Sequence, residues 1–348
     1  MENIFIKHII NIDTKVVDAL KKLDSLAEDA LLFIIDDDNK LVASVSDGDI
    51  RRGLINGVEL TNKVYIISNK NPKSIVENKY SLDDIIFLRD SDFRIVPVIN
   101  ENQEVKSIIN FRLLESYLPI DAVIMAGGLG SRLMPLTRDT PKPLLKIHNK
   151  AVIDYNIDRL SKFGITSFHV SVRYLGDQIK IHLSERMDSG NFNIYHENEP
   201  MGTLGSVSLI DRFVNDTVLV TNSDIITDLN YEDFYRKFNK SKADVMVATV
   251  PYKVEVPFGV LELNGNIVAK ISEKPQYIYE CNAGIYLFKK RVLEEMIVEN
   301  RVDTPDFLNS MINNGLTVSF YRIKSYWLDI GRMSDFEKAK SDVLDLDL

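Results

Sequence analysis

Cysteine is nearly absent from the chain: its one cysteine, Cys281, has no second thiol with which to form an internal disulfide. Because disulfides are typical of oxidising compartments, this composition fits a reducing cytoplasm, which is the location we expect. No apolar run approaches the roughly 20 residues that a membrane-spanning helix needs. The first residues, Met1–Phe5, carry an acid and lack the apolar core of a signal peptide. We therefore expect no membrane partner.

An excess of basic residues is also missing, since the 348 residues carry a formal net charge of −9. A protein that binds DNA or RNA presents a basic face to the phosphates, so nucleic acid is not an expected partner. The hydrophobic fraction of 45% is ordinary for a globular protein. The length is sufficient for two domains that each have a core.

The most informative segment is Ala126–Thr137, which begins directly after the apolar run Asp121–Met125. That run predicts a buried parallel strand. Glycine occupies three of the four positions 127–130, as Gly127, Gly128 and Gly130. Bare backbone can wrap around a polyphosphate and direct N–H groups at its oxygens. With Arg132 and Lys142 as nearby cations, the segment predicts a site for a nucleoside triphosphate.

Two better-known phosphate motifs do not match this loop, and a glycine pair after a strand can also be only a tight turn. No Gly-Lys-Ser/Thr sequence closes the loop, so it is not a Walker A motif. Leu133 stands where a dinucleotide fingerprint has its third glycine, and Pro135 prevents a helix from opening there. A nicotinamide-dependent oxidoreductase is therefore the weaker alternative.

Two aspartates suggest a metal site beside this loop. Asp224 follows the apolar strand Val218–Val220, and Asp329 follows the apolar residues of Tyr326–Leu328. Mg²⁺ takes oxygen ligands, usually one or two protein carboxylates together with substrate phosphates. Each aspartate taken alone fits a solvated turn. Their joint position after strands predicts that Asp224 and Asp329 hold Mg²⁺.

From Asp121 to the end of the chain, residues 121–348, short apolar runs alternate with helical patterns. Lys150–Phe163, Gln178–Met187 and Tyr231–Phe238 have helical spacing, whereas Phe168–Val172 and Val245–Thr249 read as strands. This alternation predicts an α/β domain, Rossmann-like, with a mostly parallel sheet and helices on both faces. Ligands of such sheets bind beyond the carboxyl ends of the strands, where the glycine loop lies.

Residues 1–118 contain a repeat, with copies at about 1–62 and 63–118. Leu41–Ile50 aligns with Val105–Leu114, and each copy reads as helix, strand, turn, strand, helix. This α+β arrangement resembles a tandem pair of CBS (cystathionine β-synthase) modules, which often bind adenine nucleotides. The resemblance implies that Ser46 and Asp49 form one such site. The second copy has Asn110 and Leu113 there and lacks the acid, and a homo-oligomerisation module without ligand is the alternative.

The motifs after residue 120 resemble, in order, those of the sugar-1-phosphate nucleotidyltransferases. They comprise Ala126–Thr137 with Pro141-Lys142-Pro143, Gly202-Thr203, Asp224, Glu273-Lys274-Pro275, Asn282-Ala283-Gly284 and Trp327–Gly331. The resemblance implies that the nucleotide is bound by Ala126, Gly127, Gly128, Gly130, Ser131, Arg132, Glu197, Gly202 and Thr203. It implies that the sugar phosphate is bound by Gly259, Glu273, Lys274, Asn282 and Gly284. Catalysis would rest on Arg132, Lys142, Lys274 and Asp224, with Mg²⁺ on Asp224 and Asp329.

The base is expected beside Glu197, where related thymidylyl and uridylyl enzymes often have glutamine. A carboxylate only accepts hydrogen bonds, and guanine offers it two adjacent donors, whereas uracil and thymine offer one donor between two acceptors. We therefore expect GTP, with UTP or dTTP as the alternative. The order of domains resembles that of bacterial guanylyltransferases of nonulosonic acid synthesis, which supply surface glycans. A catalytically inactive, CBS-regulated nucleotide sensor is the alternative from another class.

Overall fold

The chain forms two compact units in the computed structural model, which describes residues 5–186, 191–296 and 301–346. Residues up to Pro119 make up most of the first unit, and Ile120–Leu160, Ser167–Met187 and Asn191–Leu348 make up the second. Within the described residues, no helix is both long and apolar enough to cross a membrane. Each unit has a hydrophobic core of its own.

The first unit contains two three-stranded sheets with the same strand order and pairing. In each sheet the first two strands are parallel, the last two are antiparallel, and the ladder is irregular near the end of the middle strand. The first sheet and its helices are β1 (Ile9–Asn11), α2 (Val16–Ser25), β2 (Leu31–Ile35), β3 (Leu41–Ser46) and α3 (Asp47–Ile55). The second consists of β4 (Ile75–Val76), α4 (Leu82–Asp90), β5 (Ile95–Ile99) and β6 (Val105–Asn110).

The prediction of a helix after β6 is wrong, because Phe111–Leu113 forms only a turn. After β3, Ser46 and Asp49 exchange hydrogen bonds in a capping box that starts α3. At the aligned place after β6, Leu113 stands where Asp49 would be and cannot complete such a box. The Asn110 amide donates instead to Asp29 at 2.9 Å, which ties the second sheet to the first.

The second unit is built on a seven-stranded sheet of order β11-β10-β7-β12-β17-β14-β18. Its strands are β7 (Ile120–Ala126), β10 (Ser167–Val172), β11 (Asn191–His196), β12 (Thr217–Asn222), β14 (Val245–Glu255), β17 (Gln276–Lys289) and β18 (Val318–Arg322). β11, β10, β7 and β12 are parallel neighbours, whereas β17 pairs antiparallel with both β12 and β14. The expectation of a mostly parallel sheet is confirmed. β7 lies near the centre and is almost fully buried, as its continuous apolar sequence predicts.

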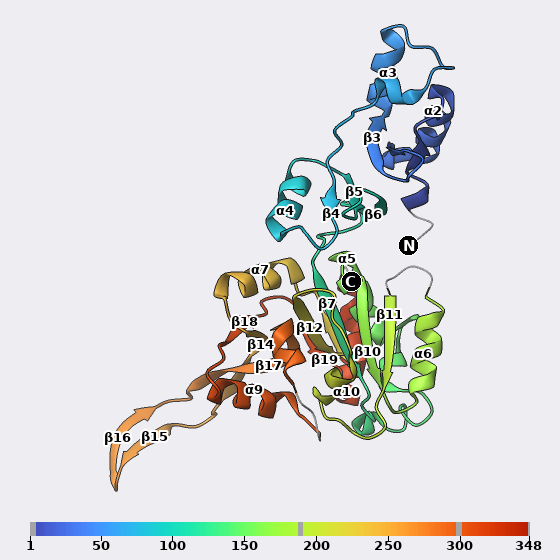
Figure 1. Ribbon diagram of the computed structural model, residues 1–348. Helices are drawn as coiled ribbons and strands as arrows, with labels where there is room; N and C mark the ends of the chain where they lie inside the picture. The colour runs from blue at the N-terminus through green and yellow to red at the C-terminus, as the bar shows by residue number, and fades with distance from the viewer. Residues whose placement is uncertain (1–4, 187–190, 297–300, 347–348) are drawn as a thin grey trace. The chain divides into compact units, whose positions relative to one another are not determined.

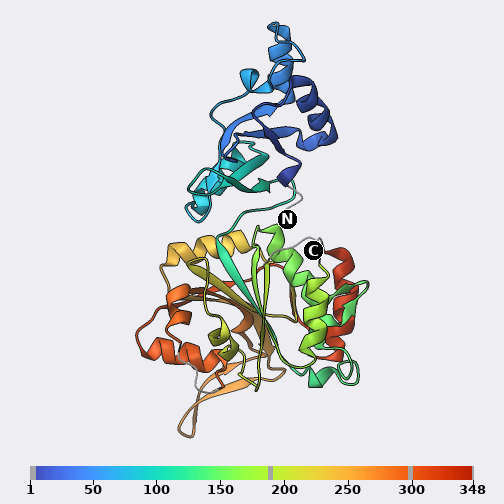
Figure 2. The same ribbon diagram turned by 45° about the vertical axis from the view of Figure 1, so that its right-hand side comes forward.

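Helices flank this sheet, as Figure 2 shows, with α5, α6 and the red α10 on one side and α9 on the other. They are α5 (Val152–Lys162), α6 (Gly176–Ser184), α7 (Tyr231–Ser241), α8 (Lys290–Glu294), α9 (Thr304–Asn313) and α10 (Met333–Asp342). The helix predicted at Gln178–Met187 corresponds to α6, and its predicted last residue, Met187, lies outside the described residues. Two short strands, β13 (Ile225–Thr227) and β19 (Trp327–Asp329), pair antiparallel beside the main sheet.

The strand predicted at Val245–Thr249 is longer than its apolar run, since β14 continues to Glu255 and pairs there with the start of β17. Beyond this pair, β15 (Val260–Asn264) and β16 (Ile267–Ser272) form a two-stranded ribbon that projects from the sheet (Figure 1). Large apolar side chains on this arm are exposed, Ile267 to 74% and Phe258 to 73%.

Candidate active site

Four polar or glycine residues lie in a row at the carboxyl ends of the parallel strands. Val172 of β10 pairs with Ala126 of β7 on one side and with His196 of β11 on the other. The next residues, Gly127, Arg173 and Glu197, are therefore neighbours along the sheet edge. Asn222 of β12 pairs with Met125, so Asp224 continues the row beyond Gly127. This is the edge at which α/β sheets bind ligands.

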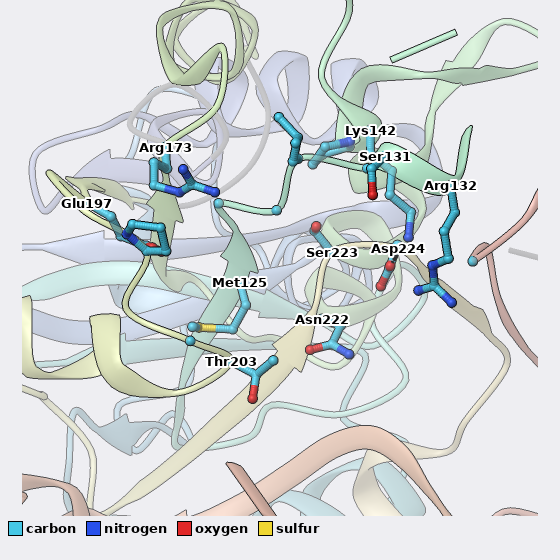
Figure 3. A pocket seen from close by; sticks show the side chains of 18 of the residues that line it. Met125, Ser131, Arg132, Lys142, Arg173, Glu197, Thr203, Asn222, Ser223 and Asp224 are labelled. Carbon is cyan, nitrogen blue, oxygen red and sulfur yellow. Dashed lines mark hydrogen bonds and ion pairs between the residues drawn. The ribbon is translucent and has the colours of Figure 1, made fainter. Parts of the chain in front are cut away.

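The edge opens into a cavity of about 450 Å³, which is within the range of small-molecule sites. Figure 3 shows Glu197 and Arg173 at one end and Asp224 and Arg132 at the other. The charged side chains that line the cavity are Arg132, Lys142, Arg173, Arg301, Glu197, Asp224, Asp303 and Asp329. Four formal positive charges thus face four carboxylates. A triphosphate would meet no net positive charge here unless a cation accompanied it.

The glycine loop packs closely against side chains at both of its ends. A Cβ on Gly127 would lie 2.6 Å from Oε1 of Glu197, so only glycine leaves room for that carboxylate. Gly130 has φ +64, and the hydroxyl of the buried Thr137 donates to its carbonyl oxygen at 2.9 Å. Gly128 has no neighbour within 4 Å of a built Cβ and faces open space. The loop therefore offers exposed backbone between two fixed ends.

Asp224 and Asp329 are brought together by the β13–β19 ladder, in which Ile225 pairs with Asp329. The amide of Ile330 donates to the carbonyl oxygen of Asp224 at 3.0 Å. One buried carboxylate oxygen of each aspartate, Oδ1, has no hydrogen-bond partner among the described residues. Buried oxygens without donors fit a cation, and two carboxylates are the protein ligands that Mg²⁺ usually takes. No cluster of three or more acidic, histidine or cysteine ligands occurs in the described parts of the chain.

The proximity of the two aspartates affects the pKa of Asp329. Burial, and then the negative charge of Asp224, raise the pKa of the Asp329 carboxyl above its usual range. Lys142 and Arg132 oppose this shift. Lys142 forms an ion pair with Asp224, and both side chains are largely buried. Arg132 is exposed and lies near Gly331: a Cβ added to Gly331 would be 3.5 Å from Nη1 of Arg132. Two cations thus face the proposed metal ligands.

Glu197 is 8% exposed, and its carboxylate is fixed at both oxygens. The Ser171 hydroxyl donates to Oε1, and the Met201 amide donates to Oε2 at 3.3 Å. Each carboxylate oxygen can accept a second hydrogen bond. The carboxylate therefore can present fixed acceptors to a ligand at this end of the cavity.

Gly202 and Thr203 line the cavity and are held by residues 301–304, which sequence reasoning did not include in the site. The Thr203 amide donates to Asp303 Oδ1 at 3.0 Å, and Arg301 pairs with the other oxygen of Asp303. Gly202 has φ +86, and a Cβ there would lie 2.3 Å from the Val302 carbonyl oxygen. No sequence motif marks Arg301 and Asp303, because their role depends on a contact between segments about 100 residues apart.

The residues expected to bind the sugar phosphate lie outside the lining of this cavity. Gly259, Glu273 and Lys274 are exposed at the base of the β15–β16 arm, where a built Cβ on Gly259 would be 3.1 Å from Glu273. The Asn282 side chain bonds to Tyr286 and to the Gly284 amide. Gly284, with φ +73, packs against Asn222, which does line the cavity. The described lining therefore includes the residues expected to hold the metal and, apart from the buried Ala126, those expected to bind the nucleotide, but none of those expected to bind the sugar phosphate.

In the first unit, Ser46 and Asp49 are neighbours at the start of α3. Asp49 accepts hydrogen bonds from the Ser46 amide and hydroxyl and forms an ion pair with Arg52 at 2.6 Å. These contacts lower the pKa of the Asp49 carboxyl although burial opposes them. The same capping box is formed by Ser81 and Asp84 at the start of α4. The geometry at Asp49 alone is therefore explained by helix capping.

Comparison with known proteins covers the second unit. Mannose-1-phosphate guanyltransferase beta-A of Xenopus laevis is 32% identical over 228 residues, and the matched region is 62% of each chain. The corresponding catalytic subunit beta of Dictyostelium discoideum is also 32% identical, with the same coverage. The chain thus spans about 62% of the length of these relatives.

Solved structures share the fold of this unit. HddC from Yersinia pseudotuberculosis superimposes with a TM-score of 0.51 at 26% identity, covering 64% of this chain and 99% of that one. A Bacillus anthracis structure whose name places it among glucose-1-phosphate thymidylyltransferases superimposes with a TM-score of 0.53 at 23% identity, covering 66% and 97%. The profile described as nucleotidyl transferase matches residues 121–345. Through this region the chain belongs to the nucleotidyl transferase family.

Proposed function

We propose that the chain transfers a guanylyl group from GTP to a sugar 1-phosphate, in a reaction that depends on Mg²⁺ and releases pyrophosphate. The observation that carries the proposal is the pair of buried carboxylate oxygens of Asp224 and Asp329 without hydrogen-bond donors, beside Lys142 and at the end of the glycine loop. Family membership supports it, since the named relatives are guanyltransferases that act on a sugar 1-phosphate.

The proposed reaction is a single in-line displacement. A phosphate oxygen of the sugar 1-phosphate attacks the α-phosphorus of GTP. The new P–O bond forms while the bond to the bridging oxygen of pyrophosphate breaks, and pyrophosphate leaves with the electron pair. The attacking oxygen is already anionic, so no general base and no protein nucleophile are needed. Positioning and electrostatic stabilisation then carry the rate, as in other phosphoryl transfers.

The residues of the cavity supply those two effects. Gly127, Gly128 and Gly130 present backbone N–H groups to the triphosphate, and Ser131 adds a hydroxyl. Lys142 and Arg132 neutralise charge at the α-phosphate and at the departing pyrophosphate. When bound by Asp224 and Asp329, Mg²⁺ would supply further positive charge at the phosphates.

The choice of guanine as the base rests on Glu197. Ser171 and Met201 fix its carboxylate at the opposite end of the sheet edge from Asp224. The guanyltransferase names of the relatives support it. A uridylyl- or thymidylyltransferase is the second candidate, because the Bacillus anthracis neighbour bears a thymidylyltransferase name.

The sugar would be bound by Gly259, Glu273, Lys274, Asn282 and Gly284, which requires the base of the β15–β16 arm to approach the cavity. Lys274 would meet the sugar phosphate. The named relatives act on mannose 1-phosphate, whereas the order of domains resembles the glucosamine-1-phosphate guanylyltransferase of legionaminic acid synthesis. We propose bacterial surface-glycan synthesis in the cytoplasm as the context.

For the first unit we propose a CBS pair that binds an adenine nucleotide at Ser46 and Asp49 or joins two copies of the chain. The identical strand order of its two sheets supports the CBS assignment. Only the first sheet carries the required acid after its third strand, so we expect one nucleotide site rather than two.

The function is tested by measuring pyrophosphate release with GTP, ATP, UTP and dTTP against the 1-phosphates of glucosamine, mannose, glucose and a heptose. We expect release that requires Mg²⁺ and a sugar phosphate, with GTP preferred. The variant Asp224→Asn should be inactive, and Glu294→Gln, an exposed carboxylate on α8, should behave as wild type. Preference for UTP or dTTP would overturn the choice of base. Absence of release with every pair would instead support an inactive nucleotide sensor.

A further inference from the structure

Arg173 occupies a position in the cavity for which neither the family motifs nor the metal site provides a role. It follows β10 directly and lies between Gly127 and Glu197 at the sheet edge, as the register of Val172 requires. Figure 3 shows its side chain at the same end of the cavity as Glu197 and away from Asp224. Ser171, two residues earlier on the same face of β10, donates to the Glu197 carboxylate.

The guanidinium of Arg173 has no hydrogen-bond or ion-pair partner among the described residues, although it is half-buried. Lys142 and Arg301 differ, because they pair with Asp224 and Asp303. Arg132 is likewise without a partner among the described residues, but it lies at the opposite end of the cavity, near Asp224. Arginine presents several N–H donors in a planar fork and is always charged. A free fork that lines a cavity beside fixed carboxylate acceptors is suited to a ligand with acceptors next to donors.

Guanine has this arrangement of groups. Its N1–H and N2 amino group are donors for Glu197, and its O6 and N7 are adjacent acceptors for an arginine fork. Adenine has an amino group in place of O6, which would face the guanidinium donors. Uracil and thymine have no N7. Of the four bases, guanine alone satisfies both side chains.

We propose that Arg173 binds the O6/N7 edge of the guanine base and, with Glu197, determines the choice of GTP. The inference rests on the proposed function, because it presupposes that a nucleotide base lies beside Glu197. A rival role for Arg173 is contact with the triphosphate. In the row Glu197–Arg173–Gly127–Asp224, Arg173 is next to both Glu197 and the glycine loop, so its place in the row fits either role. The base is favoured because the side chain lies at the Glu197 end of the cavity, away from Asp224.

The test compares kcat/KM for GTP and 7-deaza-GTP, which lacks the N7 acceptor, in the wild type, Arg173→Met and Arg173→Lys. We expect the wild type to lose about tenfold with 7-deaza-GTP, as for one good arginine–guanine contact. Arg173→Met should lose at least as much on GTP and then be insensitive to the deaza substitution. Arg173→Lys, a single point donor, should be intermediate. Thermal unfolding should be unchanged, because the side chain has no partner to lose among the described residues.

Arg51→Met, an exposed arginine on α3 in the first unit, is the matched control and should retain wild-type kinetics. Equal losses of Arg173→Met on GTP, ATP and UTP, with full sensitivity to 7-deaza-GTP retained, would overturn the proposal in favour of phosphate contact. Equal use of GTP and 7-deaza-GTP by the wild type would also overturn it. Failure of the proposed function is distinct, because it would appear as preference of the wild type for UTP or dTTP.

Discussion

In the proposed site, we expect charge neutralisation to depend most on Lys142. It is largely buried and paired with Asp224, so its charge is fixed beside the proposed metal ligands. We predict that Lys142→Met lowers kcat by about 100- to 1,000-fold, the usual cost of removing one preorganised electrostatic group. Lys146→Met, an exposed neighbour on β8 (Lys146–Ile147), is the control. Steady-state kinetics that show a KM effect alone would assign Lys142 to ground-state binding.

We expect the ionised carboxylate of Asp329 to lower the stability of the folded protein when no Mg²⁺ is bound. Burial and Asp224 raise the pKa of its carboxyl, so the folded protein holds a proton there more tightly than the unfolded chain does. The stabilising effect of this proton is complete below the unfolded pKa and is lost as pH rises through the raised folded pKa. We predict that Asp329→Asn without Mg²⁺ is more stable than wild type at neutral pH, by on the order of 1 kcal/mol.

The measurement is chemical denaturation of both proteins between pH 4 and 8, with and without Mg²⁺. The gain from Asp329→Asn should shrink as pH falls, and Mg²⁺ should stabilise only the wild type. A variant that is less stable than wild type at neutral pH, with Glu294→Gln unchanged, would contradict the electrostatic account of this pair.

Some residues of the candidate site could be identified from the sequence, and others could not. Asp224 and Asp329 could be identified because each follows an apolar run that predicts a strand, and Glu197 because it stands where related enzymes often have glutamine. Arg173 also follows such a run, but its role depends on the register between β10 and β11, which the sequence does not state. Glu273 and Lys274 were named from motifs, yet they lie on an exposed arm whose approach to the cavity no local pattern predicts.

At the scale of elements, the segment that carries Gly202 and Thr203 depends on the start of α9. Val302 accepts hydrogen bonds from the amides of Leu204 and Gly205, so the two segments form one wall of the cavity. A Cβ at position 202 would collide with the Val302 carbonyl oxygen at 2.3 Å. The need for glycine here therefore comes from a contact distant in sequence as well as from its backbone angle.

We predict that Gly202→Ala destabilises the protein and raises KM for the nucleotide, because the wall must shift. Gly265→Ala is the matched control: Gly265 also has positive φ, +62, but has no neighbour within 4 Å of a built Cβ. It should cost only the backbone strain, about 1 kcal/mol, and leave KM unchanged. Equal destabilisation by both substitutions, measured by urea unfolding, would show that the Val302 contact is unimportant.

The two capping boxes of the first unit provide an internal control for the CBS proposal. Asp49→Ala and Asp84→Ala remove equivalent caps from α3 and α4, at about 1 kcal/mol each. We predict that AMP binding, measured by calorimetry, weakens about tenfold in Asp49→Ala and is unchanged in Asp84→Ala. Equal weakening in both variants, or no binding of AMP or ATP to the wild type, would contradict a nucleotide site at Asp49.

The elements of the second unit were largely predictable, because their apolar runs and helical spacings are long and clear. The first unit was less so. Its second copy lacks the helix expected after β6, because Leu113 cannot complete the capping box that Asp49 completes in the first copy. An alignment of apolar positions therefore overestimated the similarity of the two copies.

At the scale of the whole molecule, the family region covers residues 121–345, and the residues proposed to bind the metal, the phosphates and the base all lie within it. The chain is acidic overall, with a net charge of −9, and its cavity carries equal numbers of cationic and anionic side chains. Binding of a triphosphate should therefore require a divalent cation. This requirement follows from the summed charges of segments spread over the region, which no single motif reveals.

The central claim is that an oxygen of a sugar 1-phosphate attacks the α-phosphorus of GTP in this cavity. It is tested most directly with mannose or glucosamine 1-phosphate labelled with ¹⁸O at its three terminal phosphoryl oxygens, and mass spectrometry of both products. We predict that all of the label appears in the GDP-sugar and none in the pyrophosphate. Label in the pyrophosphate, or no nucleotide sugar from any of the four triphosphates, would contradict it.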